Sequence, residues 1–409
     1  MKIGFFTLPH TGHLHPATAL GRRLSQRGHE IIFFNFVTTK AIIRAAELSF
    51  APIPTPCSQG MMPPKEFSLK AQESLYGLQV TTKLMLTEVP KVIKSANLDA
   101  LVVDQMDFAT GTVAEMLGLP FVQFSTSAPI YESSSVPPIC FSWQYSQSRA
   151  AQKRNIAGNA LLWKLLAPVF SILNQQRQLW GLRPFQSIND TISPRALVTQ
   201  IPDFLDFPSE WKPAQLFHAG PFFDGCGRRV IKFPWERLTD KPLVYASMGT
   251  RRNDERQIFN MIAEACDGMG LQLVITTGGN LEEIGALAGD PIVVPYAPQP
   301  ELLSRASLVI THAGANTVLE SLSNGVPLVS VPVADDQPGV AARIEWAGVG
   351  KVVPFRKVST ENLRKAVRDV LENPAYRSAA RKMQTMIHEK DGLELAADII
   401  ESALSQTIR

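Results

Sequence analysis

Short apolar runs alternate with amphipathic helical patterns from the first residues of the chain. One helical pattern places Ala17, Leu20 and Leu24 on one face and ends at Gly28, and another covers residues 110–117. Strand-like apolar runs flank these helices. They occupy residues 3–7, 30–36, 100–103 and 121–124. This alternation is typical of a parallel sheet with crossover helices.

The alternation is interrupted in the middle of the chain and then starts again. Residues 127–184 contain Ser/Pro-rich turns followed by a helical stretch at 161–180, and the Pro/Gly-punctuated residues 219–234 are typical of a linker. Beyond the linker, the pattern predicts strands at residues 243–246, 271–276, 292–294, 308–311 and 328–331, and helices at 255–267, 300–305, 317–323, 360–371, 375–388 and 393–404. The second half therefore predicts a second parallel α/β unit.

The predicted fold class is α/β, with two Rossmann-like, doubly wound parallel-sheet domains. We place the first domain at residues 1–222, a linker at 223–240 and the second domain at 241–389. A C-terminal helix over residues 390–409 is expected to pack back on the first domain. Two such domains facing each other imply a cleft in which ligands bind.

Composition narrows the choice of partners and compartment. The 409 residues include 40 Lys+Arg and 37 Asp+Glu, a formal net charge of +3, which disfavours a nucleic-acid-binding role. The 4 cysteines show no CxxC spacing, so neither a disulfide framework nor a zinc ribbon is predicted. The N-terminal apolar run is too short for a signal peptide, and no run of about 18 apolar residues exists. We therefore expect a cytoplasmic protein.

Polar residues that directly follow strands are the first to consider, because ligands bind beyond the carboxyl ends of parallel strands. The first strand is followed by three of the seven histidines, His10, His13 and His15. Between them, Gly12 permits close approach of a ligand, and Pro16 suits the first turn of a helix. His13 is the preferred general base. A metal site formed by the three histidines and a purely structural or capping role are the alternatives.

Two carboxylates follow the strand at residues 100–103. Asp104 comes directly at its end and is placed to orient and charge-stabilise an imidazole, as the acidic partner of a histidine base does. Asp107 fits better as the cap of a helix that begins near Thr110. For either residue, capping a helix or closing a turn is the alternative role.

The segment from Thr311 to Glu320 has the pattern of a strand end, a small-residue turn and a helix start. Such a turn suits an anion, because unpaired backbone N–H groups at a helix N-terminus hold phosphate. His312, Asn316 and Thr317 would add side-chain donors. Thr317 and Glu320 also fit a capping box, which explains both residues without any ligand.

Two further loops are candidates for nucleotide-sugar contacts. Residues 247–250 (Ser-Met-Gly-Thr) follow a predicted strand and form a second phosphate candidate. Asp335, Asp336 and Gln337 follow another strand and offer groups that hydrogen-bond sugar hydroxyls, with a solvated acidic turn as the alternative. The sequence contains no GxxxxGK[ST] motif, and no GxGxxG motif follows the first strand. Nucleotide binding therefore depends on another arrangement.

Taken together, these motifs resemble the nucleotide-sugar-dependent glycosyltransferases of family 1, whose two-Rossmann-domain architecture is called GT-B. The resemblance spans the whole chain and rests on the N-terminal GHLHP sequence and a C-terminal donor box. The matching residues of the box are Tyr296-Ala297-Pro298-Gln299, His312-Ala313-Gly314, Asn316-Thr317, Glu320, Gly325-Val326-Pro327 and Asp336-Gln337. Other stretches are similar to bacterial zeaxanthin (carotenoid) glucosyltransferases, and the chain also resembles macrolide and flavonoid glycosyltransferases.

The resemblance implies an inverting transfer of a hexose to an acceptor hydroxyl. His13 corresponds to the catalytic base of the family, and Asp104 corresponds to its partner. The base deprotonates the acceptor hydroxyl, which attacks the anomeric carbon while the nucleoside diphosphate leaves. No bound cofactor or metal is implied, because the helix N-terminus at Gly314 to Thr317 takes the place that Mg²⁺ holds in other phosphate-leaving reactions.

The donor box implies roles for single residues of the C-terminal domain. Tyr296 is expected to stack on the uracil, although plant relatives have Trp there. Gln299 and Glu320 are expected to meet the ribose. Asp336 and Gln337 are expected to read the hexose, and Gln337 favours UDP-glucose. The donor-binding residues expected from the resemblance are Gly12, Ser247, Gly249, Thr250, Tyr296, Ala297, Gln299, His312, Gly314, Ala315, Asn316, Thr317, Glu320, Asp336 and Gln337.

The acceptor is expected to be an apolar alcohol such as a carotenoid, flavonoid or phenol, bound by the N-terminal domain. The candidate lining residues are Phe67, Tyr76, Met106, Phe108, Ile130 and Phe141. Aromatic residues in such segments are more often core than pocket. A carotenoid would bring the protein to a membrane surface, where the basic cluster Arg149, Lys153 and Arg154 would help or would merely be solvated. We expect a monomer or weak dimer.

Two other functions compete with this hypothesis. A nucleotide-sugar epimerase of GT-B shape would turn over the donor without any acceptor, and a catalytically silent accessory protein would only bind nucleotide sugar. The GHLHP sequence with Asp104 argues against the epimerase. The intact base and donor box argue against the silent protein.

Overall fold

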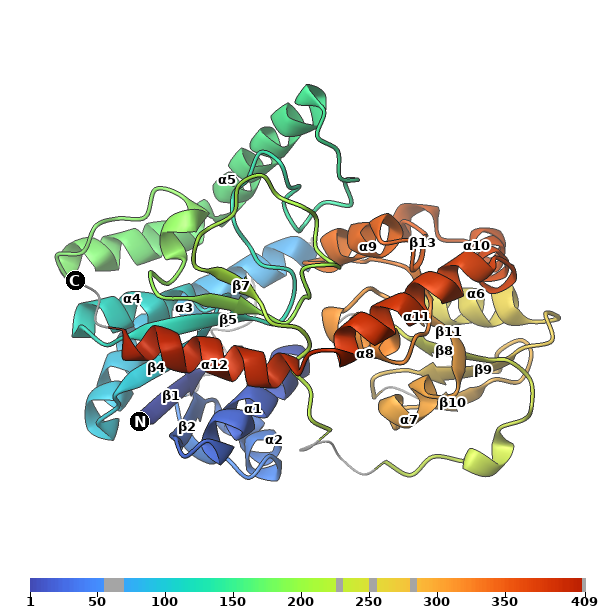
Figure 1. The fold of residues 1–409 in the computed structure, drawn as a ribbon, viewed down its shortest axis with the longest axis horizontal. Coiled ribbons are helices and arrows are strands. Elements are labelled where there is room, and N and C mark those ends of the chain that lie inside the picture. The colour runs from blue at the N-terminus through green and yellow to red at the C-terminus, as the bar shows by residue number, and fades with distance from the viewer. Residues whose placement is uncertain (55–69, 226–230, 250–255, 280–284, 407–409) are drawn as a thin grey trace. The chain divides into compact units, whose positions relative to one another are not determined.

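A computed structural model describes the chain except residues 55–69, 226–230, 250–255, 280–284 and 407–409 (Figure 1). The chain divides into two units, of which unit 1 comprises residues 1–138, 146–228 and 391–409 and unit 2 comprises residues 139–145 and 229–390. The predicted boundaries assign residues 139–145 to the first domain, whereas their contacts place them in unit 2.

Within the described residues, unit 1 is built on a seven-stranded parallel sheet with the order β3-β2-β1-β4-β5-β6-β7. Its strands are β1 (Lys2–Phe6), β2 (Glu30–Asn35), β3 (Ser49–Pro52), β4 (Ala100–Asp104), β5 (Phe121–Ser125), β6 (Leu197–Thr199) and β7 (Leu216–His218). Strands β2 and β3 follow β1 on one side of it, and β4 then pairs with β1 on its other side. The carboxyl ends of β1 and β4 therefore flank a topological switch point, where ligands bind in such sheets.

Consecutive aromatic residues of β1 supply the cores on the two faces of this sheet. Phe5 stacks on Phe33 at 4.8 Å in one core, and Phe6 stacks on Phe34 at 5.1 Å in the other. Both strands are apolar on both faces because helices cover each side. The helical elements of unit 1 are α1 (Thr11–Gln26), η1 (Val37–Thr39), α2 (Lys40–Ala45), α3 (Lys70–Ala96), α4 (Phe108–Leu117), α5 (Arg149–Leu179), η3 (Ile188–Thr191) and α12 (Gly392–Ser405).

Helix α12 returns to unit 1 from the end of unit 2 (red in Figure 1). Its apolar residues, including Leu393 and Ile400, join the core formed by α1 and the sheet. At the surface, Arg27 of α1 donates to Glu401 at 2.8 Å and to Asp398 at 2.6 Å. The C-terminal segment therefore completes the core of unit 1.

Unit 2 contains a six-stranded parallel sheet in its described residues, with the order β10-β9-β8-β11-β12-β13. Its strands are β8 (Leu243–Ser247), β9 (Gln272–Thr276), β10 (Ile292–Val294), β11 (Ala306–Thr311), β12 (Leu328–Ser330) and β13 (Gly350–Val352). The helical elements are η4 (Trp235–Arg237), α6 (Arg256–Cys266), α7 (Gln299–Leu303), α8 (Ala315–Ser323), α9 (Gln337–Trp346), η5 (Phe355–Lys357), α10 (Thr360–Glu372) and α11 (Pro374–His388). The switch point of this sheet lies between β8 and β11.

The early segment 139–145 joins unit 2 by close backbone contact with α9. Gly339 lies so near the backbone of Ile139 that a side chain at position 339 would clash with it. Phe141 and Trp143 stack on each other at 4.1 Å, and Tyr145 contacts Trp346 of α9 edge to face. This packing explains why the division by contacts differs from the sequence-based boundary here, because local sequence gives no sign of a partner 200 residues away.

The predicted fold class is confirmed, but several elements were not predicted. They are the edge strands β3, β7 and β13, the internal strand β6 and the helices α2, α3 and α9. The strands have only three or four residues each, too few to show a period. The expectation for Pro16 is wrong, since α1 begins at Thr11 and Pro16 lies inside the helix.

Candidate active site

His13 and Asp104 meet at the switch point of unit 1. His13 lies in the first turn of α1, and Asp104 is the last residue of β4, which pairs with β1. The His13 Nδ1 atom lies 2.7 Å from Asp104 Oδ2, and Thr126 Oγ1 lies 3.2 Å from the same nitrogen. The imidazole is half-buried, with 22% of its side chain exposed. A histidine that is held at Nδ1 by a carboxylate acts as a base through Nε2.

Asp104 is buried and fully used as an acceptor. Its Oδ2 accepts from Thr7 Oγ1 at 3.0 Å as well as from His13, and its Oδ1 accepts from the backbone N–H of Met106 at 3.0 Å. Burial alone would raise the pKa of Asp104, but the His13 charge and these hydrogen bonds outweigh it and lower the pKa below its ordinary value. The ionised carboxylate therefore accepts, which assigns the proton of His13 to Nδ1.

His10, another histidine of the segment, lies near His13. The ring centroids of His10 and His13 are 6.3 Å apart. Among the described residues, no cluster of three or more His, Cys, Asp or Glu side chains is arranged to hold a metal ion.

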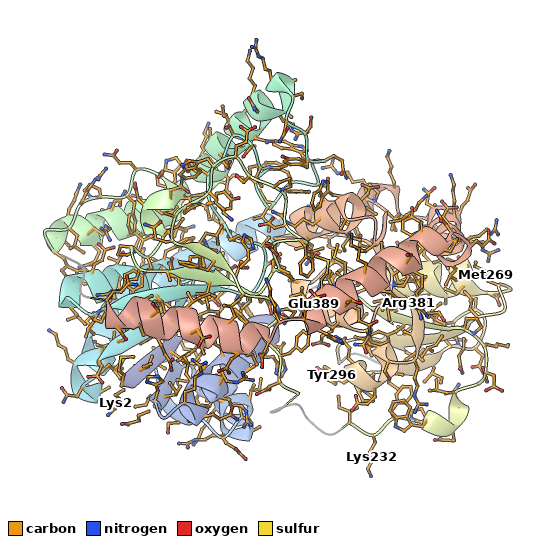
Figure 2. All side chains as sticks on the ribbon, in the orientation of Figure 1. Lys2, Lys232, Met269, Tyr296, Arg381 and Glu389 are labelled. Atoms are coloured by element: carbon orange, nitrogen blue, oxygen red, sulfur yellow. The ribbon has the colours of Figure 1, made fainter. Side chains whose placement is uncertain are left out.

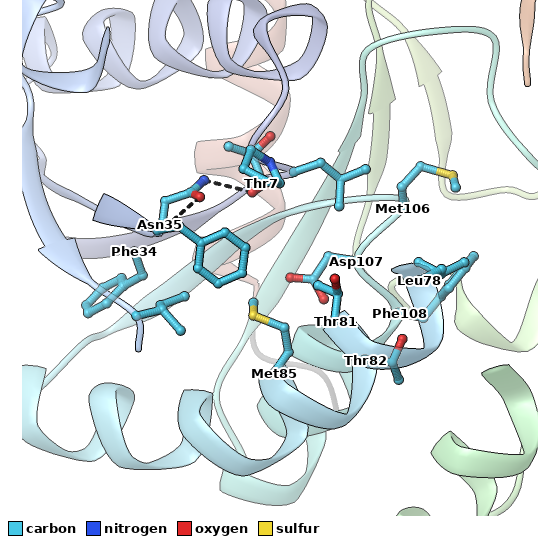
Figure 3. A pocket seen from close by; sticks show the side chains of 14 residues that line it. Thr7, Phe34, Asn35, Leu78, Thr81, Thr82, Met85, Met106, Asp107 and Phe108 are labelled. Carbon is cyan, nitrogen blue, oxygen red and sulfur yellow. Dashed lines mark hydrogen bonds between the residues drawn. The ribbon is translucent and has the colours of Figure 1, made fainter. Parts of the chain in front are cut away.

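A pocket opens next to the pair at the carboxyl ends of β1, β2 and β4 (Figure 3). It is lined by Thr7, Leu8, Pro9, Phe34, Asn35, Phe36, Ile53, Leu78, Thr81, Thr82, Met85, Met106, Asp107 and Phe108. Thr7 connects the pocket to the pair, because the same side chain donates to Asp104. The lining is mostly apolar, and its two methionines adapt easily to different ligand shapes.

The structure brings only part of the expected acceptor set to this pocket. Met106 and Phe108 line it, whereas Tyr76 and Ile130 lie outside its lining. Phe141 belongs to unit 2 with segment 139–145, so its placement in the N-terminal domain is corrected. Phe67 lies outside the described residues. The residues of α3 and β2 were missed, because the sequence gives no local sign of which helix face turns toward a strand end.

Asp107 is the N-cap of α4, as the sequence indicates. Its Oδ1 accepts from Thr110 N at 3.0 Å and its Oδ2 from Thr110 Oγ1 at 2.6 Å. Burial raises the pKa of Asp107 to about 6, with help from the nearby charge of Asp104 and against the hydrogen bonds from Thr110. A carboxyl group with this pKa changes its charge close to neutral pH.

In unit 2, His312 follows β11 and lies against two glycines. A Cβ atom on Gly249 would lie 2.7 Å from His312 Cε1, and one on Gly314 would lie 2.6 Å from Nε2. Gly249 also has a φ of +82°, which favours glycine. Burial lowers the pKa of His312 below its ordinary value, against the charge of Asp336 and a hydrogen bond to the Ser247 backbone. The neutral imidazole can therefore donate to an anion without competing for a proton.

The turn after His312 directs the N-terminus of α8 toward the same place. Ala313 has a φ of +68°, a left-handed conformation that is unfavourable for alanine, and Gly314 is the N-cap without a side-chain bond. Thr317 lies inside the helix, so the capping-box alternative for Thr317 and Glu320 is wrong. The first N–H groups of α8, beside Asn316, form the N-terminus that the phosphate hypothesis requires.

Glu320 belongs to a chain of hydrogen bonds that joins four elements, α8, α7, β8 and β9. Gln299 Nε2 donates to Glu320 Oε2 at 2.8 Å. The hydroxyl of Tyr245, a fully buried residue of β8, donates to Gln299 Oε1 at 3.1 Å and lies 3.1 Å from Thr276 Oγ1. Sequence reasoning missed Tyr245, which looks like an ordinary core residue of an apolar strand.

Tyr296 lies at the surface of unit 2 (Figure 2) with 48% of its area exposed. Its hydroxyl donates to the carbonyl of Gly278 at 3.0 Å, and Gly279, with a φ of +126°, lets the loop after β9 approach the ring. An exposed ring that is fixed at its hydroxyl end offers a flat face for stacking. Ala297 follows it directly, and Thr250 lies outside the described residues.

Gln337 and Asp336 begin α9, after β12. Gln337 Oε1 accepts from the backbone N–H groups of Val333 and Ala334 at 2.8 and 3.1 Å, and the side chain is buried. Asp335, with a φ of +58°, makes the sharp turn that precedes the helix. The side-chain oxygen of Gln337 therefore stabilises the loop that carries Asp336.

The chain is similar in sequence to known proteins. Residues 238–401 match the family model described as UDP-glucoronosyl and UDP-glucosyl transferase. The chain is 29% identical over 408 residues to the zeaxanthin glucosyltransferase of Pantoea ananas, covering 97% of this chain and 94% of that protein. It is 25% identical over 417 residues to the 4'-demethylrebeccamycin synthase of Lentzea aerocolonigenes, covering 97% of each.

Solved structures agree with the fold. The glycosyltransferase of kitacinnamycin superposes with a TM-score of 0.78 at 20% identity, and the calicheamicin glycosyltransferase CalG4 with 0.74 at 21%, each covering 98% of both chains. The chain is a glycosyltransferase with the GT-B fold. Its residues 238–401 match the UDP-glucoronosyl and UDP-glucosyl transferase family model, in agreement with the sequence resemblance.

Proposed function

We propose that the protein is an inverting glycosyltransferase that transfers glucose from UDP-glucose to a hydroxyl group of a lipophilic small molecule. The observation that carries the proposal is the 2.7 Å contact between His13 Nδ1 and Asp104 Oδ2 beside an apolar pocket. The mostly apolar lining of the pocket favours an apolar alcohol, and the similarity to a zeaxanthin glucosyltransferase and to a 4'-demethylrebeccamycin synthase supports an acceptor of this class.

In this mechanism His13 is the catalytic base and Asp104 its positioning partner. Nε2 takes the proton of the acceptor hydroxyl as its oxygen bonds to the anomeric carbon, and the bond from that carbon to the diphosphate breaks on the opposite face. The ionised Asp104 stabilises the imidazolium that forms and keeps the ring in its productive tautomer. Attack opposite the leaving group inverts the anomeric configuration.

The donor-side residues are assigned to unit 2. Tyr296 stacks on the uracil, and Gln299 with Glu320 holds the ribose. His312 and the N-terminus of α8 receive the diphosphate, whose charge grows as it leaves, so preorganised donors there favour the transition state over the bound substrate. Asp336 and the amide nitrogen of Gln337 bind the hexose hydroxyls, which are the groups that distinguish glucose from its epimers.

Product analysis tests this function. The purified protein is incubated with UDP-glucose and a panel of zeaxanthin, flavonols, phenols and sterols, and products are detected by mass spectrometry beside the variant His13→Ala. We expect a hexose adduct in the wild type only, and proton NMR of the purified product should show a β-linkage formed from the α-linked donor. Retention of the α configuration would contradict the mechanism, and adduct formation by His13→Ala would contradict the assignment of the base.

A further inference from the structure

Helix α5 presents an apolar face that unit 1 does not cover. Three large aliphatic side chains on its first half, Ile156, Leu161 and Leu165, are 56%, 47% and 52% exposed. This part of the helix projects away from the sheet of unit 1 (Figure 1). Aliphatic side chains gathered on one exposed helix mark an interaction surface more often than chance exposure does.

The same helix is strongly and exclusively basic. Its 31 residues contain five cationic side chains, Arg149, Lys153, Arg154, Lys164 and Arg177, and no Asp or Glu. Arg177 is buried and pairs with Glu115 at 2.7 Å, so four positive charges remain for the first half of the helix. Such an excess is complementary to a polyanionic surface.

The lysines lie between the aliphatic side chains on the exposed half of the helix, with Ile156 at one edge of that half and Leu165, nine residues further on, at the other edge. Lys153 and Lys164 are three helical turns apart and therefore point the same way, with Ile156 on one side of the line between them and Leu161 on the other. Both lysines are exposed. Alternating ammonium groups and aliphatic chains match the boundary between lipid phosphates and acyl chains.

The opposite face of α5 is fixed to unit 1 by buried polar contacts. Asn155 Nδ2 donates to the Ser134 carbonyl at 2.9 Å, and Asn159 Nδ2 donates to the Ser133 carbonyl at 2.9 Å. Among the described helices, α5 is the one long and apolar enough to cross a bilayer by length and composition. These polar contacts instead hold it against the domain, so that its exposed face can only lie along a membrane.

We propose that this face, which we call the α5 surface (Lys153, Ile156, Leu161, Lys164 and Leu165), docks on the surface of anionic lipid bilayers. The aliphatic side chains enter the acyl boundary, and the lysines meet lipid phosphates. A second copy of the chain fits less well, because a symmetric contact through α5 would oppose two basic helices. The inference goes beyond the proposed function, although a lipophilic acceptor dissolved in the bilayer would be reached from this position.

Vesicle sedimentation of the full-length protein without substrates tests the docking. We expect cosedimentation with vesicles of phosphatidylglycerol and phosphatidylcholine, and at least tenfold weaker partitioning onto pure phosphatidylcholine or in high salt. Lys153→Glu/Lys164→Glu and Ile156→Gln/Leu161→Gln/Leu165→Gln are each expected to lower partitioning at least tenfold. Circular dichroism and the melting temperature should stay at wild-type values, because none of these side chains is buried.

A matched control changes the same kinds of residue on other elements. Val37 of η1 is 59% exposed, and Lys40 begins α2; Val37→Gln/Lys40→Glu should bind vesicles like the wild type. The proposal is wrong if the wild type ignores anionic vesicles, or if the α5 variants and the control lose binding equally. A dimer in light scattering that Leu161→Gln converts to a monomer, without any vesicle binding, would assign the face to self-association instead. Glucosyl transfer is not measured, so failure here leaves the proposed function untouched.

Discussion

Asp104 Oδ2 lies 2.7 Å from His13 Nδ1 and at the same time accepts from Thr7, a residue that lines the neighbouring pocket. One buried oxygen thus links the proposed base to the wall of the proposed acceptor site. The parallel pairing of β1 with β4 produces this relationship, because it brings residues ninety positions apart to one edge of the sheet.

Removing the charge of Asp104 should cost activity far more than stability. For Asp104→Asn we expect kcat/KM to fall about 10²–10⁴-fold, because the amide neither fixes the tautomer of His13 nor stabilises an imidazolium. Steady-state kinetics measures this. Asp99→Asn changes an aspartate at the other end of β4 and should leave kcat/KM near the wild-type value; a comparable loss there would point to a disturbed strand.

Gly314→Ala should weaken nucleotide binding through His312. The new Cβ would lie 2.6 Å from His312 Nε2 and displace the ring. Loss of one hydrogen bond to a charged phosphate corresponds to about 1.5–3 kcal/mol, so calorimetry should show UDP binding about 10- to 100-fold more weakly. Gly285→Ala in the same unit has no atom within 4 Å of the new Cβ and should bind UDP normally.

Tyr245→Phe should act on the donor through Gln299 and Glu320. Without its hydroxyl, Gln299 Oε1 loses a buried partner, and the unfolding free energy should fall by about 1 kcal/mol. We expect the KM for UDP-glucose to rise while that for the acceptor stays constant. In a double-mutant cycle with Gln299→Ala, the effects on donor KM should not add; additive effects would show that Tyr245 is only a core residue.

Asp107 should make the free energy of unfolding depend on pH between about 4 and about 6. Its folded pKa is raised from 3.8 to about 6, so the native state binds the proton more tightly than the unfolded chain does. Stability should therefore fall as pH rises from about 4 to about 6, by up to about 3 kcal/mol. Asp107→Asn keeps the cap and removes this loss. Chemical denaturation of both proteins at pH 4 and pH 7 measures their free energies of unfolding. The variant should become more stable relative to the wild type as the pH rises. A difference in unfolding free energy that is the same at both pH values would refute the assignment.

Gly12→Ala should change stability and activity in opposite directions. Gly12 lies in the first turn of α1, and a Cβ there meets no atom within 4 Å. Alanine should raise the unfolding free energy by about 0.5–1 kcal/mol, since it restricts the unfolded chain. If the nucleotide sugar approaches this glycine, as the family resemblance implies, kcat/KM should nevertheless fall, because the added methyl group would obstruct the sugar. A variant that is both more stable and fully active would exclude Gly12 from donor contact.

The sequence alone determined the fold class and the positions of the main polar residues at strand ends. Strand and helix periods depend on neighbours within one or two turns, so the βα alternation around His13, Asp104 and His312 could be predicted without knowing any distant contact. The family resemblance followed from the same local segments, because the donor box and GHLHP are continuous in the chain.

Only the tertiary structure decided which of these residues meet. It joined His13 to Asp104, excluded the capping box at Thr317 by starting α8 at Ala315, and committed the oxygen of Gln337 to its own loop. It also moved Phe141 into unit 2 and revealed Tyr245 behind Gln299. These facts depend on strand order, on side-chain direction and on contacts between segments far apart in the chain. The local pattern of hydrophobic and polar residues does not predict these long-range contacts.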